Sequence, residues 1–316
     1  MADFYGVQDK TIRLRLNRLG IKPKPLITEE QRQEIIDAYD TASSSELAKK
    51  YNVSQSWING IWLKAGKHGK PCRSYYFNED YFENIEREDQ AYWLGFLAAD
   101  GCVYKPKDNR QSIVSISLEI TDKYLLENFT KCLNTNKPVS VVSNKNHPER
   151  KYANLQLSSN KMVSDLAKYG IHPRKTYDDN WPTNIPEKLI PSYIRGYFDG
   201  DGCISKHFTP NTLHKVNISI AGFEINISHF VDYLATQNIN AKLIRDKRGK
   251  GRNESDHFVV LYFTNKNERQ KFLHLIYDNA TIYMDRKYNL AQQFFKYCEI
   301  SPKTWTIDKK IDDAVC

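Results

Sequence analysis

Two segments of the chain repeat nearly the same sequence at the distance of a whole domain. "YWLGFLAADGCVY" spans residues 92–104, and "YIRGYFDGDGCIS" spans residues 193–205. Asp100 matches Asp201, each is followed by a glycine and a cysteine, and the two copies lie 101 residues apart throughout. The repeat therefore predicts two related domains, each carrying one copy.

The residues after each copy predict the same order of elements. In the first half, the apolar periodicities predict helices at 90–100, 121–133 and 160–170, and strands at 102–105, 112–120, 139–143 and 152–158. In the second half, they predict helices at 187–201, 224–238 and 267–277, and strands at 203–207, 215–222, 241–246 and 257–263. The order αββαββα occurs twice, which predicts a duplicated α+β fold.

The repeated segments predict helices that are buried on almost every side, because large apolar residues surround both. Gly95 in the first helix and Gly196 in the second have no side chain, so the two backbones can come nearly into contact. Such an approach brings Asp100 beside Asp201 at the helix ends. Each aspartate precedes a glycine that lets the chain turn out of the helix into a strand.

Two carboxylates held together at the C-terminal ends of helices repel one another and face the negative ends of the helix dipoles. A divalent cation removes that cost. Carboxylate oxygens suit Mg²⁺, for which Mn²⁺ can substitute, and paired metal ions can hold the attacking and leaving oxygens of a phosphodiester. We therefore predict a magnesium site at Asp100 and Asp201. The alternative is that both aspartates only cap helices in an inactive duplicate.

The nonapeptides "WLGFLAADG" at 93–101 and "IRGYFDGDG" at 194–202 resemble the motif of LAGLIDADG homing endonucleases of the single-chain, two-motif type. The resemblance covers about residues 85–298. It implies a saddle of two antiparallel sheets and a monomer that hydrolyses both strands of a long, asymmetric DNA site. It also assigns the metal to Asp100 and Asp201, with the backbone of Gly101 and Gly202 as further ligands.

The resemblance also points to two catalytic lysines. Lys175 lies in "HPRKTYDDNWPTNIPEK", ahead of the second motif, and Lys287 lies in "YMDRKYNLAQQF". A cation near the scissile phosphate stabilises developing charge or helps to polarise the attacking water. For each lysine, an ordinary surface charge is the alternative. One departure from the motif is at its sixth position, which is Asp199 in the second copy and Ala98 in the first.

Basic residues cluster at the predicted hairpin tips. In a saddle over the major groove these cations would neutralise phosphates, while neighbouring polar residues would read bases. The alternative is that each run is a solvated loop. The predicted DNA contacts are Lys105, Lys107 and Arg110 in the first tip, Lys145, Arg150 and Lys151 in the second, and Arg245, Lys247, Arg248, Lys250 and Arg252 in the third.

The N-terminal region predicts a separate all-α domain. Thr28 and Gln31 have the spacing of a capping box, and "ELAKKYNVSQSWING" at 46–60 resembles helix-turn-helix DNA-binding domains. Its last helix would offer Gln55, Ser56 and Asn59 to base edges; a three-helix protein-interaction module is the alternative.

The expected divisions of the whole chain are a partial helix-turn-helix repeat at 1–22, the helix-turn-helix domain at 23–68, a linker at 69–84, LAGLIDADG subdomains at 85–180 and 181–300, and a tail at 301–316.

Composition agrees with a nucleic-acid partner and excludes some classes of protein. Lys and Arg total 46 against 38 for Asp and Glu, a net charge of +8 that favours a polyanionic partner such as nucleic acid, and the resemblance implies that this partner is double-stranded DNA. There is no apolar run of membrane length and no signal region, so we expect no membrane partner and a cytoplasmic protein, or one in a nucleoid, nucleus or organelle matrix with its DNA. Two alternative functions stay open: an inactive transcription regulator and an intron RNA maturase.

Overall fold

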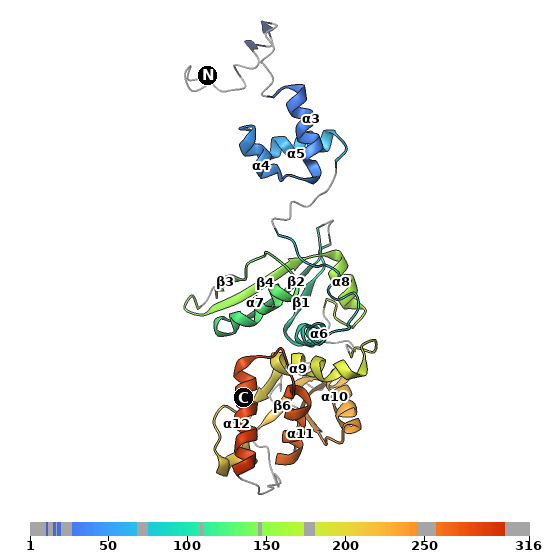
Figure 1. The fold of residues 1–316 in the computed structure, drawn as a ribbon, viewed down its shortest axis with the longest axis vertical. Helices are drawn as coiled ribbons and strands as arrows, with labels where there is room; N and C mark the ends of the chain where they lie inside the picture. Colours follow the sequence, from blue (N-terminus) through green and yellow to red (C-terminus); the bar gives the residue numbers. More distant parts are fainter. Residues whose placement is uncertain are drawn as a thin grey trace. The chain divides into compact units, whose positions relative to one another are not determined.

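A computed structural model describes residues 27–67, 75–107, 110–144, 147–173, 181–245 and 257–300, together with five residues before them: Thr11, Arg15, Leu16, Arg18 and Leu19 (Figure 1). The chain divides into two compact units, Met1–Ser74 and Tyr75–Cys316. None of the described helices has both the length and the apolarity that a membrane span needs.

From residue 27 onward, the described part of the N-terminal unit contains α3 (Glu29–Asp37), α4 (Ser44–Lys50) and α5 (Gln55–Lys64), with a short 3₁₀ turn, η1 (Ala38–Asp40), after α3. The predicted capping box is confirmed, since the Gln31 amide donates to the Thr28 hydroxyl at 3.2 Å and the Thr28 amide donates to the Gln31 side chain at 3.0 Å. Trp62 joins α5 to α3 by donating its indole N–H to the Ile35 carbonyl at 2.6 Å.

The C-terminal unit contains two halves with the predicted element order, and the predicted α+β class is confirmed. The first half consists of α6 (Glu88–Asp100), β1 (Cys102–Tyr104), β2 (Ile113–Glu119), α7 (Lys123–Cys132), β3 (Ser140–Ser143), β4 (Lys151–Ser158) and α8 (Asn160–Ala167). The second consists of α9 (Ile190–Asp201), β5 (Gly202–Ile204), β6 (Ile218–Phe223), α10 (Glu224–Thr236), β7 (Lys242–Arg245), β8 (Phe258–Tyr262) and α11 (Lys266–Tyr277). Short 3₁₀ turns also occur: η2 (Ile120–Asp122), η4 (Glu187–Leu189) and η5 (Pro210–Lys215).

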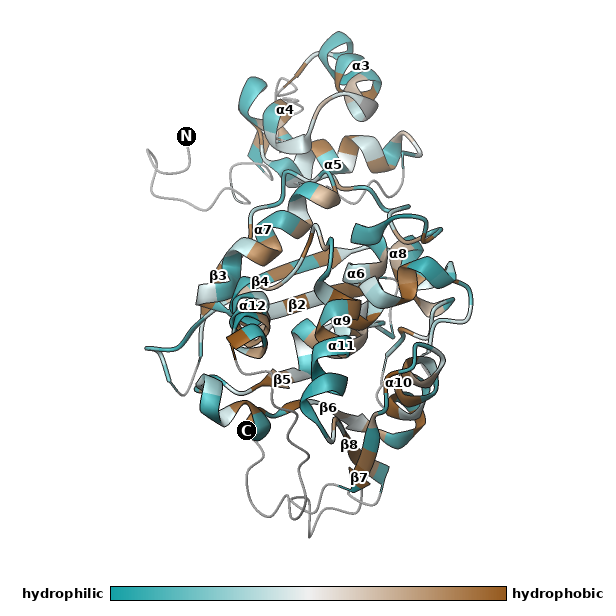
Figure 2. Ribbon diagram, turned by 60° about the horizontal axis from the view of Figure 1, so that its bottom comes forward, coloured by the Kyte–Doolittle hydropathy of each residue, from teal (hydrophilic) through white to brown (hydrophobic). Residues whose placement is uncertain are grey.

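Each half forms a four-stranded antiparallel sheet, with orders β1-β2-β4-β3 and β5-β6-β8-β7. Apolar and polar residues alternate along the central strands of the first sheet, as Figure 2 shows. Val114, Ile116 and Leu155 are buried towards the helices, whereas their sequence neighbours lie on the opposite face. We call this opposite face of each sheet the outer face.

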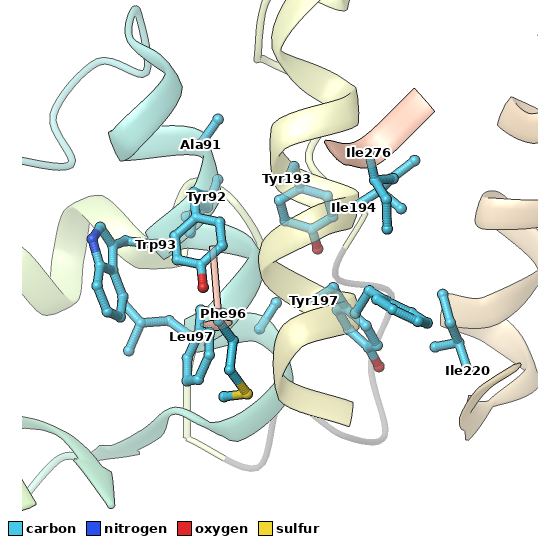
Figure 3. Packing of buried hydrophobic residues seen from close by; sticks show 14 of the residues in the cluster. Ala91, Tyr92, Trp93, Phe96, Leu97, Tyr193, Ile194, Tyr197, Ile220 and Ile276 are labelled. Carbon is cyan, nitrogen blue, oxygen red and sulfur yellow. The ribbon is translucent and has the colours of Figure 1, made fainter. Parts of the chain in front are cut away.

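Helices α6 and α9 lie side by side between the two halves (Figures 1 and 3). Gly95 packs against the backbone of Tyr193, and Gly196 packs against the backbone of Tyr92. A Cβ at either glycine would overlap the carbonyl oxygen of its partner tyrosine. The reciprocal contact confirms that the two backbones nearly touch.

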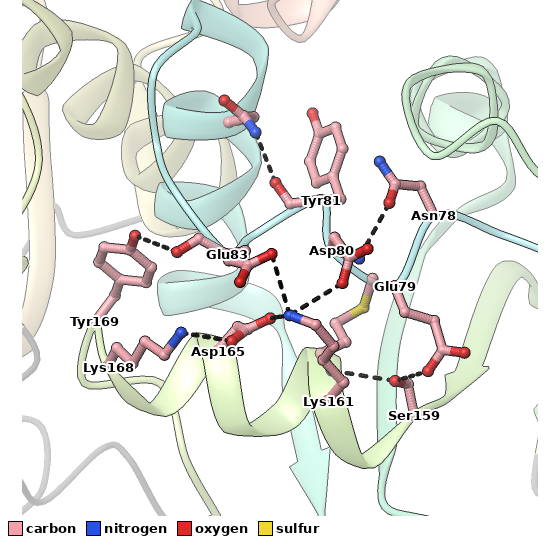
Figure 4. A network of polar contacts seen from close by, with 12 residues as sticks. Asn78, Glu79, Asp80, Tyr81, Glu83, Ser159, Lys161, Asp165, Lys168 and Tyr169 are labelled. Atoms are coloured by element: carbon pink, nitrogen blue, oxygen red, sulfur yellow. Dashed lines mark hydrogen bonds and ion pairs between the residues drawn. The ribbon is translucent and has the colours of Figure 1, made fainter.

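The segment before α6 is fixed to α8 by polar contacts (Figure 4). Lys161 binds Asp165 at 2.9 Å, Asp80 at 3.0 Å and Glu83 at 3.4 Å. The hydrogen bonds that Lys161 donates to these carboxylates, Asp165 first, raise its pKa. Tyr81, 1% exposed, belongs to the core of the same unit, so α6 starts from an anchored chain.

A further helix, α12 (Asp285–Ile300), follows α11 and was not among the predicted helices. Its buried residues recur at helical spacing, and this pattern in the sequence could have identified the helix. They are Lys287, Ala291, Phe294 and Cys298.

We expect Gly95→Ala and Gly196→Ala each to lower the free energy of unfolding by about 1–3 kcal/mol or more, because the added methyl group meets backbone that cannot move aside. Gly60→Ala in α5 is the matched control. A Cβ there has no neighbour within 4 Å, so we expect a gain of up to about 1 kcal/mol from helix propensity. Calorimetry on the full chain measures all three. Wild-type stability of Gly95→Ala would contradict the close helix contact.

Candidate active site

Asp100 and Asp201 are the last residues of α6 and α9. Both are exposed, although most of the residues before them in the two helices are buried. The glycines that follow have φ of −72° at Gly101 and −77° at Gly202, so neither uses a left-handed conformation. They are required for space, because a Cβ at Gly101 would lie 2.5 Å from the Leu97 carbonyl oxygen. The chain thus passes from each carboxylate directly into an edge strand.

The two helix ends are in contact. A Cβ at Gly200 would lie 2.6 Å from the Cβ of Ala99 and 3.5 Å from Oδ2 of Asp100. The Asp100 carboxylate therefore lies against the residue that precedes Asp201. Burial raises the pKa of Tyr197, and the negative charges of Asp201 and Asp100 both add to this shift. Both carboxylates thus act on one buried hydroxyl.

Lys287 of α12 lies at the end of α9. It is 4% exposed, and its ammonium donates to the carbonyls of Phe198 at 2.6 Å, Asp199 at 2.9 Å, Gly200 at 3.3 Å and Gly202 at 2.5 Å. A cation suits the negative end of the helix dipole. Burial lowers the pKa of Lys287 to about 8, although the charges of Asp199, Asp100 and Asp201 oppose that shift. In this position Lys287 fixes the helix end that presents Asp201.

Asp199 is fully buried and joins α9 to α6, to α11 and to the residue before α12. Its carboxylate accepts hydrogen bonds from the hydroxyls of Tyr92 at 2.9 Å and Tyr277 at 2.7 Å, and from the Met284 amide at 2.7 Å. Burial raises the pKa of Asp199, while Lys287 and these donors lower it. The sixth motif position of the second copy therefore carries a structural carboxylate, which spacing in the sequence did not indicate.

Arg195 was not among the predicted site residues. It is 2% exposed and donates to the carbonyls of Ile282 at 2.8 Å and Ile276 at 2.7 Å, and to the Glu88 carboxylate. Glu88, at the start of α6, also accepts from the Thr281 amide at 2.9 Å. A charged residue within an otherwise apolar helix was the signal for this network.

The start of α12 also contacts the first half. The Asp285 amide donates to the Tyr124 hydroxyl at 2.6 Å, and Arg286 binds Asp122 at 3.1 Å. The helix that supplies Lys287 is therefore attached to both halves of the unit.

The described residues contain no group of three or more His, Cys, Asp or Glu side chains able to hold a metal ion. The candidate ligands are two exposed carboxylates, which fit Mg²⁺ because this ion is commonly bound by one or two carboxylates together with water and substrate phosphates. Of the predicted backbone ligands, Gly101 is buried, and the Gly202 carbonyl accepts the hydrogen bond from Lys287.

The predicted DNA-contacting residues lie on the surface where the structure describes them. Lys105, Lys107, Arg110, Arg150 and Lys151 are exposed around the ends of strands in the first sheet. In the second half, Arg245 is exposed and lies 3.9 Å from Glu224. The other predicted cations fall outside the described residues: Lys145, Lys175, Lys247, Arg248, Lys250 and Arg252.

In the N-terminal unit, α5 has a buried face and an exposed face. Ile58 and Trp62 are buried, whereas Gln55, Ser56 and Asn59 are exposed together at the start of the helix. The preceding turn contains Asn52 at a φ of +54°, which asparagine tolerates better than most residues. The partial repeat predicted at 1–22 falls almost wholly outside the described residues.

We expect higher pH to stabilise the wild-type protein relative to Lys287→Met. The folded pKa of Lys287 is about 8, whereas an unfolded lysine titrates near about 10.4. Between these values the unfolded chain binds more protons than the folded protein, so the free energy of unfolding rises with pH. Urea unfolding at about pH 7 and about pH 9.5 measures the difference. Lys296→Met, on the exposed face of α12, is the control; the same pH dependence in both variants would contradict burial of the Lys287 ammonium.

Comparisons with known proteins give the following matches. The family described as LAGLIDADG-like domain matches residues 87–177 and 189–277, together more than half of the chain. The replication factor C small subunit of Methanocaldococcus jannaschii is 26% identical over 261 residues, which cover 82% of this chain and 13% of that protein. The chain thus matches about an eighth of the length of this curated relative.

Solved structures with a similar arrangement include the homing endonuclease I-WcaI bound to its DNA recognition sequence, at 15% identity over 72% of this chain and 96% of that chain, with a TM-score of 0.45. The meganuclease I-SmaMI bound to uncleaveable DNA matches at 14% identity over 70% and 90%, with a TM-score of 0.42. Full-length WhiA from Thermotoga maritima matches at 20% identity over 69% and 64%, with a TM-score of 0.40.

Proposed function

We propose that this chain, which belongs to the family of proteins with LAGLIDADG-like domains, is a site-specific endonuclease that cuts both strands of duplex DNA. The observation that carries the proposal is the pair of exposed carboxylates, Asp100 and Asp201, at the ends of two helices in backbone contact. Each half of the duplicated unit supplies one carboxylate, which suits a substrate with one scissile bond in each strand.

Asp100 and Asp201 would hold Mg²⁺ or Mn²⁺. Such an ion, when bound, neutralises the carboxylates and lowers the pKa of a coordinated water. The surrounding residues keep the carboxylates in position: Lys287 binds the last carbonyls of α9, and Asp199 joins that helix to Tyr92 of α6. We assign Lys287 a positioning role, because its ammonium is engaged by protein carbonyls and is almost wholly buried.

The two halves differ in sequence but belong to one chain, so we propose a monomer with an asymmetric target. Exposed cations such as Lys105 and Arg150 would contact phosphates. In the N-terminal unit, Gln55, Ser56 and Asn59 would contact further base pairs and lengthen the site. The replication role in the relative's name is not carried over, because the match covers 13% of that protein.

We expect Asp100→Asn and Asp201→Asn each to lower the rate of cutting by more than about 100-fold, because a neutral amide no longer attracts the metal that stabilises the reacting phosphate. Specific binding should stay close to the wild-type value. A library of long duplexes is first selected for binding, then incubated with Mg²⁺, and the new ends on each strand are counted.

The matched control is Asp37→Asn, which changes an exposed aspartate at the end of another helix, α3. It should cut like the wild type. If both Asn variants at 100 and 201 also cut like the wild type, the two aspartates are only helix caps. If the wild type binds one site tightly and cuts nothing with Mg²⁺ or Mn²⁺, the protein is a transcription regulator. Preferential binding of structured intron RNA would instead support the maturase function.

We expect a variant lacking residues 1–74 to cut the same site but to bind it more weakly. The reason is that the removed unit has its own core and contains neither Asp100 nor Asp201. Titration of binding and of cutting, with circular dichroism to check folding, separates the two effects. A folded variant that cuts nothing even at high concentration would contradict the division of roles.

A further inference from the structure

The outer faces of the two sheets carry different side chains at equivalent positions. In the first sheet, Asn154 pairs with Ser117 on one side and with Ser140 on the other. We call these three residues the polar row. In the second sheet, Val260 pairs with Ala221 on one side and with Ile244 on the other, and these three form the apolar row.

The register shows that the two rows are equivalent. Cys102, the second residue after Asp100, pairs with Ser115, and Cys203, the second residue after Asp201, pairs with Ser219. Ser117 and Ala221 each follow two residues later on the same strand and therefore on the same face. The two halves can therefore be compared position by position. The three equivalent positions carry hydrogen-bonding side chains in the first half and hydrocarbon side chains in the second.

The polar row is partly connected within itself. The side-chain amide of Asn154 donates to the Ser117 hydroxyl at 2.7 Å, and the Ser140 hydroxyl donates to the main-chain carbonyl of Asn154 at 3.0 Å. Ser117 and Ser140 are exposed. Asn154 is half-buried, as are Ala221 and Ile244, whereas Val260 between them is 5% exposed. The side chains of the apolar row have no atom able to donate or accept a hydrogen bond.

The next pair of residues along each sheet continues the difference. Glu119 pairs with Tyr152 in the first half, whereas Phe223 pairs with Phe258 at the equivalent place in the second. The two phenylalanine rings lie 5.7 Å apart at an interplanar angle of 87°. The contrast therefore covers two consecutive rows of the outer face and is not confined to one residue; in the row before them, Ser115 and Ser219 are alike.

The positions of the two aspartates and of nearby lysines favour DNA as the ligand of the outer faces. The helices cover the opposite face of each sheet. One glycine separates Asp100 from the edge strand β1, and the edge strand β5 begins directly after Asp201. Lys242 lies on the outer face of the second sheet, paired with Tyr262, and is exposed; Lys206, just after β5, is exposed too. A duplex whose phosphates reach both carboxylates would therefore run across both outer faces, with these cations near its backbone.

We propose, resting on the endonuclease function proposed above, that the two halves read DNA by different chemistry. The polar row forms hydrogen bonds with base edges in the major groove. In the apolar row, the half-buried Ala221 and Ile244 pack against the 5-methyl groups of thymines, while the buried Val260 lies between them. This methyl group is the one apolar group that base pairs display in the major groove. The two half-sites are thus recognised differently: the second sheet contacts thymine methyl groups, and the first sheet contacts hydrogen-bond donors and acceptors of the bases.

The test uses a duplex selected from a random library by binding to the full-length wild-type protein without Mg²⁺. Two versions are made, each with deoxyuridine in place of thymine in one half only. This exchange removes methyl groups and leaves every donor and acceptor of the base pair. We expect the version with deoxyuridine in the half-site of the second sheet to bind about fourfold more weakly for each lost thymine methyl group that contacts the apolar row. The version with deoxyuridine in the other half-site should bind as tightly as the thymine duplex.

Reciprocal variants identify the half responsible. Ala221→Ser should weaken binding of the thymine duplex and reduce the deoxyuridine penalty, whereas Ser117→Ala, the equivalent position of the first half, should leave the penalty as it is. Equal penalties in both halves, no penalty in either, or a full penalty in Ala221→Ser would overturn the inference while the endonuclease function stands. Failure of the protein to bind any duplex would overturn both.

Discussion

The backbone contact between α6 and α9 determines where the two candidate metal-binding carboxylates, Asp100 and Asp201, lie. Gly95 and Gly196 remove the side chains that would separate the helices, so two helices from opposite halves end side by side. The same contact brings two carboxylates together at the negative ends of two helix dipoles, where they repel one another, and at the end of α9 the Lys287 ammonium offsets part of this cost. The close helix ends that pair the two carboxylates also raise their electrostatic repulsion. A bound divalent metal ion would relieve this repulsion.

Buried charges around the contact hold the helices in one register. Arg195, Asp199 and Lys287 are almost wholly buried, and each binds several partners on other elements. Removing one partner of such a group is expensive because the remaining charge stays buried. Sliding or rotation of α9 against α6 would break these bonds together, so the network favours one position of Asp201 relative to Asp100.

Much of this arrangement could be predicted from the sequence, because it follows from the duplicated pattern. The glycine contact and the pairing of helix ends come from residues that repeat at a fixed offset, and the order of helices and strands comes from the apolar periodicities of each half. Lys287 and Asp199 were harder, because the partners of each lie far away along the chain. Lys287 of α12 binds carbonyls at the end of α9, and Asp199 of α9 accepts from Tyr92, Tyr277 and Met284. A lysine in a polar stretch suggests the surface, and only its place in the stripe with Ala291 and Phe294 indicates burial.

The most direct test of a shared metal site is a crystal structure of the protein with its selected duplex and Mn²⁺, measured for anomalous scattering from manganese. Our account predicts an anomalous peak within coordination distance of carboxylate oxygens from both Asp100 and Asp201, next to a phosphate of the DNA. A bound duplex with manganese only at other positions, or with the two carboxylates turned away from each other, would contradict it.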